Sequence, residues 1–148
     1  MKSVMTMMAL ALCVAGCSGS AGEDAEKAKV APAEADAAGY EIAVRCQASF
    51  DAVARLYKVL SEQSGGSERA EMATTATQRA AAAEAYRGIA RSVGAHIGHS
   101  PEQIDMAIKG AATAVDAEFQ TRPFEDFATW VGQEADRCPP PSAQGEVK

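Results

Sequence analysis

The two histidines, His96 and His99, lie three positions apart and are the side chains of this chain best suited to bind a metal ion. Glu102 and Asp105 follow closely and would add carboxylate ligands. Metal sites need three or four converging ligands, however, and Gly98 interrupts the helical spacing that would bring these side chains together. We therefore expect no metal and no cofactor, with both imidazoles near helix-terminal carbonyls or in solvent. A helical bundle that binds a metal or a small ligand is kept as an alternative function.

No catalytic residue is predicted from the sequence. Ser92 and Ser100 each have a histidine within a few residues, but the chain lacks a nucleophile elbow and an identifiable third member of a triad. It also lacks the Glu-x-x-His motif of di-iron bundles and a haem attachment motif. We expect a protein that is not an enzyme, and a hydrolase with an unrecognised site is a further alternative.

The N-terminal segment has the pattern of an export signal. Lys2 is its single charge, residues 4–14 are mainly apolar, and small residues come directly before a cysteine in the sequence Val14-Ala15-Gly16-Cys17. A helix that spans a membrane needs about 20 apolar residues, so this run of 11 is too short. The segment resembles the signal peptide and lipobox of a bacterial lipoprotein.

The resemblance implies that residues 1–16 are removed and that Cys17 is lipidated. Lipid chains on this residue would keep the protein on a membrane, facing the periplasm. Ser18 after the lipidated cysteine favours sorting to the outer membrane, by the rule known in enteric bacteria. The alternative is ordinary cleavage near Ser20, which would give a free periplasmic protein.

The charge of the chain limits its partners. Loss of Lys2 with the signal changes the basic residues from 14 to 13 against 20 acidic residues, so the net charge of the mature chain is −7. Such a surface repels nucleic acid and anionic lipid headgroups. We therefore expect no nucleic-acid partner, membrane attachment through the lipid alone, and an envelope protein as the partner.

The remaining cysteines are expected to form a disulfide. Cys13 would leave with the signal and Cys17 would carry lipid, which leaves Cys46 and Cys138. An exported compartment is oxidising, and no Cys-x-x-Cys motif favours a metal or redox site instead. Both residues also fall on the apolar stripes of predicted helices.

The composition divides the chain into segments. Residues 17–39 contain no apolar side chain larger than valine and no apolar periodicity, so we expect a flexible tether after the lipidated cysteine. Residues 40–138 form one domain of ordinary size. Three consecutive prolines begin the segment 139–148, which is expected to be an extended, disordered tail.

The domain is predicted to be all-α. Apolar residues recur at steps of three and four in four segments, over residues 43–60, 67–97, 100–119 and 124–138. Ser67 is the expected cap of the second segment. Ser100, Pro101 and Gln103 form a capping box at the start of the third. Short links between the segments favour an antiparallel up-down-up-down four-helix bundle, closed by the disulfide between its first and last helices.

The aromatic residues are concentrated at the last turn. Phe119, Phe124, Phe127 and Trp130 are half of the eight aromatic residues and fall within 12 positions. Aromatic side chains are frequent both in cores and at interface anchors. The sequence alone favours the core for these rings; if the protein has a partner-binding surface, we expect it at Phe124, Phe127 and Trp130. The predicted function is that of a small adaptor or inhibitor on the inner face of the outer membrane.

Overall fold

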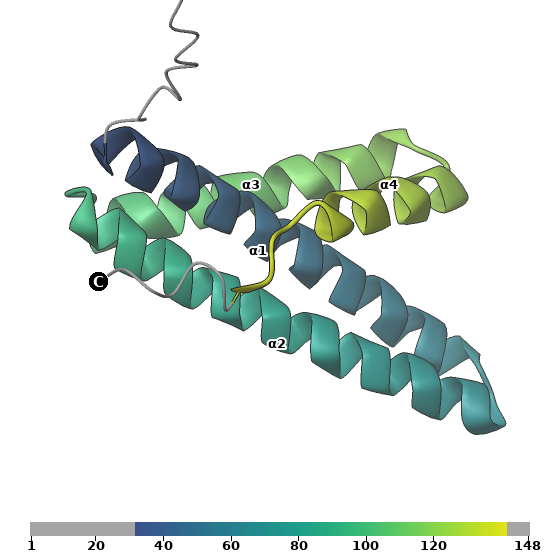
Figure 1. Ribbon diagram of the computed structural model, residues 1–148. Helices are drawn as coiled ribbons and strands as arrows, with labels where there is room; N and C mark the ends of the chain where they lie inside the picture. The colour runs from purple at the N-terminus through teal and green to yellow at the C-terminus, as the bar shows by residue number, and fades with distance from the viewer. Residues whose placement is uncertain (1–31, 142–148) are drawn as a thin grey trace, which may run out of the picture.

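The protein is helical throughout the part that the structure describes. The computed structural model describes residues 32–141, so the expected signal peptide, Cys17 and residues 142–148 lie outside the described residues. Four helices follow one another along the chain, and no strand occurs among residues 32–141. They are α1 (Pro32–Gln63), α2 (Gly66–His96), α3 (Pro101–Thr121) and α4 (Phe124–Asp136), shown in Figure 1. The prediction of an all-α domain with four helices is confirmed.

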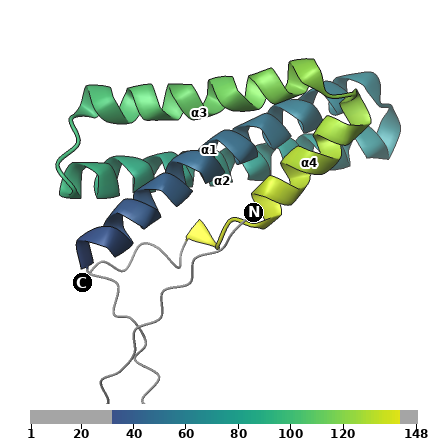
Figure 2. The same ribbon diagram turned by 90° about the horizontal axis from the view of Figure 1, so that it is seen from above.

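The helices form two hairpins of unequal length. α1 and α2 are antiparallel along their whole length, and α3 and α4 form a shorter pair that crosses the first half of α1 (Figures 1 and 2). α1 packs against the other three helices, whereas α2 and α4 do not pack against each other. The α3–α4 hairpin diverges from the far end of the α1–α2 hairpin, so the molecule opens as a wedge (Figure 1).

Local sequence explains where α3 begins. The backbone N–H of Gln103 donates to the Ser100 hydroxyl, and the Ser100 backbone N–H donates to the Gln103 side chain at 2.7 Å. This capping box is the one predicted from the sequence. The start of α2 differs from the prediction, because its cap is Gly65 rather than Ser67. Gly66 has a φ of 57°, a conformation that suits a residue without Cβ.

Helix α1 begins earlier than the sequence suggested. The expected tether runs to residue 39, but α1 starts at Pro32. The first residues of the helix are mostly alanine, with Glu34 in the first turn, where the helix dipole favours an anion. Alanine extends a helix that packing has already nucleated, without any apolar stripe of its own. The prediction failed here because it required that stripe.

The core surrounds the middle of α1, where the buried apolar side chains run from Tyr40 to Ala54. Its largest fully buried side chains are Cys46 of α1, Tyr86 of α2 and Val131 of α4. Burial raises the pKa of the Tyr86 phenol. At the end of α2 the helices approach closely: a Cβ on Gly94 would lie 2.9 Å from both Ile104 of α3 and the Tyr40 ring of α1. Glycine therefore permits the crossing of three helices at this point.

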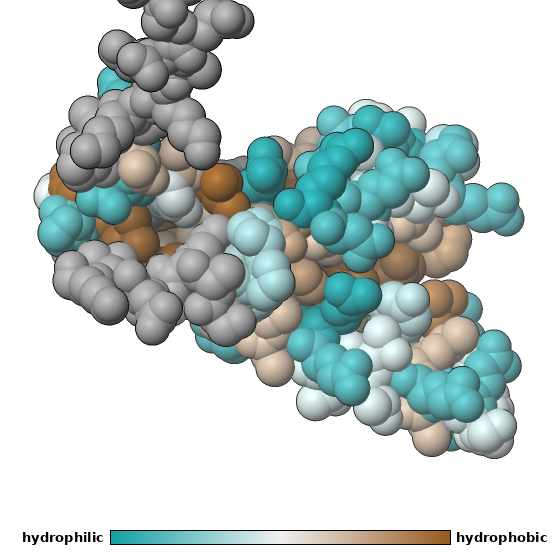
Figure 3. Space-filling model, in the orientation of Figure 1, coloured by the Kyte–Doolittle hydropathy of each residue, from teal (hydrophilic) through white to brown (hydrophobic). Residues whose placement is uncertain are grey.

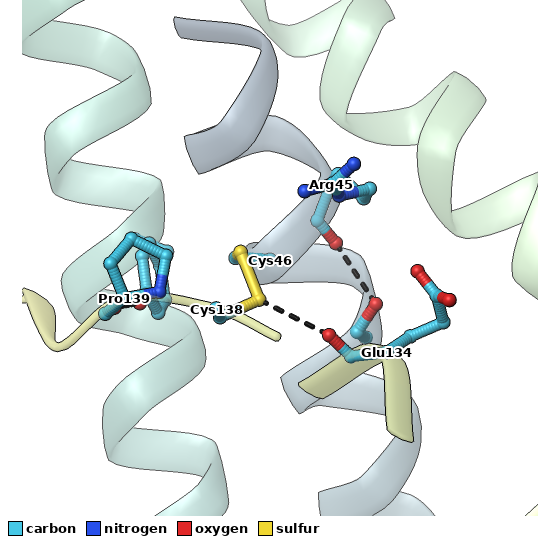
Figure 4. Close-up of a disulfide and its surroundings, with 7 residues drawn as sticks. Arg45, Cys46, Glu134, Cys138 and Pro139 are labelled. Atoms are coloured by element: carbon cyan, nitrogen blue, oxygen red, sulfur yellow. Dashed lines mark hydrogen bonds between the residues drawn. A yellow bond between two sulfur atoms is a disulfide. The ribbon is translucent and has the colours of Figure 1, made fainter. Parts of the chain in front are cut away.

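The disulfide joins α1 to the residue that follows α4. Cys46 and Cys138 are bonded, with their Cα atoms 5.8 Å apart, which confirms the predicted pair (Figure 4). Cys46 lies near the middle of α1 rather than at its start, because α1 extends back to Pro32. The bridge therefore fixes the end of the α3–α4 hairpin against the middle of the long hairpin.

The segment after the disulfide is held against α2 at its first residue. The Tyr86 hydroxyl donates a hydrogen bond to the carbonyl of Pro139, which lies beside α2 in Figure 4. This bond ties the residue after Cys138 to the domain. Proline ends the helix, as expected, but its carbonyl remains free to accept a bond from a buried phenol.

Candidate functional site: an apolar groove beside the α3–α4 turn

The two histidines have separate partners on α1. His96 Nε2 lies 3.5 Å from a carboxylate oxygen of Asp36. The ring centroid of His99 lies 4.9 Å from that of Tyr40. Within residues 32–141 no group of three histidine, cysteine, aspartate or glutamate side chains is placed to hold a metal ion. The observed contacts attach the α2–α3 link to the first half of α1.

The two candidate serines are not arranged as nucleophiles. The Ser100 hydroxyl is committed to the cap of α3, where it also donates to the Glu102 carboxylate at 2.8 Å. Hydrogen bonds from the Glu102 backbone N–H and from this hydroxyl lower the pKa of the Glu102 carboxyl. Ser92 is exposed on α2. Ser100 therefore has a structural role at the helix start.

The aromatic residues of the last turn form a chain of ring contacts. Phe127 is buried, and its ring meets that of Phe119 edge-on at 5.0 Å and that of Trp130 at 5.8 Å. Trp130 is half-buried, with the Arg122 guanidinium 5.1 Å from its ring centroid. Phe119 and Phe124 remain 50% and 47% exposed. The turn thus has one buried ring at its base and two rings largely open to solvent.

The exposed rings line a concave surface, which we call the apolar groove. It has a volume of about 290 Å³ and lies between the middle of α1 and the α3–α4 turn. Its lining residues are Ala52, Arg55, Leu56, Val59, Asp116, Phe119, Phe124 and Phe127. Figure 3 shows brown and tan surface in the notch between the two lobes of the molecule. The groove is the inner end of the wedge between the hairpins.

One ion pair spans the groove. Arg55 of α1 lies 2.9 Å from Asp116 of α3 and 3.2 Å from Asp51 of its own helix. These side chains are about half exposed, so the pairs contribute little to stability. The pair between Arg55 and Asp116 connects the α1 wall of the groove to the α3 wall, and the apolar surface between the walls remains accessible.

The predicted aromatic surface is divided between two hollows. Phe124 and Phe127 line the apolar groove, whereas Trp130 lines a neighbouring hollow of about 410 Å³ between α1, α3 and α4. That second hollow has an alanine floor, formed by Ala48, Ala107, Ala111 and Ala114. The residues that the sequence prediction grouped therefore face different surfaces.

Two groove residues on α1 were missed. Leu56 and Val59 contribute the wall opposite the rings, and Val59 is 46% exposed. The stripe predicted over residues 43–60 assigned neither residue to a binding surface. The available signal was Val59, a large apolar residue between Tyr57 and Leu60 on another face of the helix. A helix that packs on one side only has no need of such a residue there.

The chain matches no protein-family model, no curated protein and no solved structure. The functional proposal therefore rests on the geometry described above. Among the described helices, none combines the length and the apolar character that crossing a membrane requires.

Proposed function

We propose that the chain is a lipid-anchored protein of the bacterial cell envelope that binds a protein partner in the apolar groove, as a non-enzymatic adaptor or inhibitor. Support for the anchor comes from Cys17 at the end of the lipobox-like sequence. Support for binding comes from the groove. The disulfide between Cys46 and Cys138 fits an oxidising, exported location.

The observation that carries the proposal is the exposure of three large apolar side chains around one hollow. Val59, Phe119 and Phe124 are 46%, 50% and 47% exposed and come from both walls of the groove. Single exposed apolar residues are common on proteins, but a contiguous set around a concavity is typical of an interaction site. Aromatic residues at the centre of such a set are frequent binding hot spots.

The position of the groove suits an anchored protein. Leu56 is 24 residues from Pro32, so it lies roughly 36 Å along α1 from the helix end that is nearer to Cys17 in sequence. A partner would therefore approach the groove at a distance from the attachment point. The acidic character of the chain favours a protein partner over nucleic acid.

A pull-down from envelope extracts tests the binding function. Phe124→Asp places a charge in the groove, and Met106→Asp places the same charge on α3 at a side chain that is 65% exposed and outside the groove. We expect the parent chain and the Met106→Asp variant to recover the same partner protein in similar amounts. The Phe124→Asp variant should recover at least ten-fold less of it. Equal recovery with both variants would remove the groove from the proposal.

Membrane fractionation tests the anchor separately. Cys17→Ala should release the protein from membranes or block its processing, because no lipid can be attached. A Cys17→Ala protein with the mature mass of the parent and the same membrane fraction would contradict the lipoprotein assignment.

A further inference from the structure

We infer that the occupant of the apolar groove is an amphipathic α-helix of another protein, with basic residues beside its apolar face. This inference rests on the proposed function and specifies its partner. Three observations support it: the size of the groove, the spacing of its wall and the charges close to it.

The size of the groove favours the side chains of a protein segment. Its volume of about 290 Å³ lies at the lower limit of small-molecule sites, which are about 300–1,000 Å³. The groove is also open to one side, because the notch between the two lobes of the molecule is open at its outer end (Figure 3). A segment that lies along the wedge and inserts a few apolar side chains fits this form.

The spacing of the wall favours a helix. Ala52, Leu56 and Val59 follow one another at steps of four and three along α1, which makes a ridge that a second helix can pack against. The facing rings of Phe119 and Phe124 come from the ends of two further helices. No strand edge is present in residues 32–141 to pair with an extended peptide. A bound helix would therefore cover the part of α1 that α4, with 13 residues, leaves open.

Three acidic residues without an ion-pair partner among the described residues lie close in sequence to groove residues. Glu62 follows Val59 by one helical turn, and Glu125 and Asp126 follow Phe124 in the first turn of α4. All three are exposed, and none forms an ion pair with another described residue.

Two of the three basic residues close to the groove are engaged elsewhere. Arg55 is paired with Asp51 and Asp116, and Arg122 is paired with Glu118. Lys58, next to Val59, is exposed and forms no ion pair with a described residue, so three free carboxylates stand against one free ammonium group. Lysine and arginine on a partner would meet the free carboxylates. A second copy of this chain is a poorer occupant, because the mature chain has 13 basic against 20 acidic residues and is itself acidic, with a net charge of −7.

The experiment uses three synthetic 18-residue peptides and the whole purified chain in detergent. The first peptide has a continuous leucine face with lysine beside it, and the second has the same face with glutamate. The third has the composition of the first in scrambled order, which removes the face. Fluorescence anisotropy of labelled peptide measures each dissociation constant. We expect the lysine peptide to bind ten-fold or more tightly than both others.

Variants of the chain separate the apolar and electrostatic contributions. Phe124→Asp should weaken binding of the lysine peptide ten-fold or more, and Met106→Asp should leave it within two-fold. The triple variant Glu62→Gln, Glu125→Gln, Asp126→Asn should bring the lysine and glutamate peptides to similar affinity. Thermal melts check that each variant is folded.

Several outcomes would overturn the inference. Among these are binding of the scrambled peptide as tightly as the lysine peptide, no binding of any peptide, and no effect of Phe124→Asp. Self-association of the chain that Phe124→Asp abolishes would identify a second copy as the occupant instead. The proposed function fails by a different result, namely a pull-down that does not depend on Phe124.

Discussion

The two halves of α1 have different surroundings. Around Cys46 the helix is enclosed by α2, the α3–α4 hairpin and the disulfide, and its inward side chains are fully buried. Towards its C-terminal end it diverges from α3 and α4 (Figure 1), and Val59 is 46% exposed. One continuous helix thus links a closed half, where its side chains are buried, to an open half that presents apolar surface. Stability and binding can therefore be altered separately.

Removal of the disulfide should have the largest effect. The bridge closes a loop with a sequence separation of 92 residues, and on the chain-entropy model this contributes about 4–5 kcal/mol to the free energy of unfolding. The double variant Cys46→Ser, Cys138→Ser should lose roughly that amount in urea unfolding. A loss below about 1 kcal/mol would show that the closed half does not depend on the bridge. Free thiols at both positions in protein from its native envelope would contradict the bond itself.

Truncation of Phe127 and of Phe124 should distinguish a ring of the closed half from a ring of the open half by the loss of unfolding free energy. Phe127 is 5% exposed and contacts both Phe119 and Trp130, so Phe127→Ala should cost about 3–5 kcal/mol of unfolding free energy. Phe124 is 47% exposed, so Phe124→Ala should cost below about 1 kcal/mol. Chemical unfolding of the two variants gives both values. Similar losses would mean that the groove rings belong to the core.

Two glycines of α2 should respond in opposite directions. A Cβ at Gly94 would lie 2.9 Å from Ile104 and Tyr40, so Gly94→Ala should destabilise the closed half by about 1–3 kcal/mol. Gly88 has no atom within 4 Å of such a Cβ, so Gly88→Ala should stabilise the helix by about 0.5–1 kcal/mol. Thermal unfolding measures both changes. Stabilisation by Gly94→Ala would contradict the close crossing of the three helices.

The smallest effect on stability is expected from protonation of Glu102, at the start of α3, at low pH. The pKa of Glu102 is lowered in the folded chain by bonds from its own backbone N–H and from Ser100. Its contribution to stability is therefore present above the ordinary value of 4.5 and is lost as the pH falls through the folded pKa. Glu102→Gln should remove this part of the acid dependence, and Ser100→Ala should raise the Glu102 pKa in an NMR titration. An unchanged pKa in Ser100→Ala would exclude the hydroxyl as a cause.

Features determined by neighbouring residues could be predicted from the sequence. The start of α3 needs only the side chains of Ser100, Pro101 and Gln103, and it was predicted correctly. The disulfide followed from export and from the number of remaining cysteines. The start of α1 was wrong because the alanine-rich residues before Tyr40 carry no apolar period. The packing that allows this helix to begin earlier involves residues that are far away in the sequence.

The groove depends on the relative directions of helices, which the sequence pattern does not contain. Trp130 is six residues after Phe124, so it lies about 240° around α4 from Phe124 and faces the other hollow. The angle of the α3–α4 hairpin depends on how closely Gly94 lets Ile104 and Tyr40 approach. Val59 becomes a groove residue only because that angle leaves it uncovered.

Photo-cross-linking in living cells tests the groove as a partner site most directly. A benzophenone amino acid is placed at Phe124 in the whole chain, with the same residue at Met106 as the matched control. We expect one protein adduct from position 124, its loss when Val59→Asp is added, and no such adduct from position 106. Equal adducts from both positions, or none from position 124, would contradict the assignment of the apolar groove as the binding site.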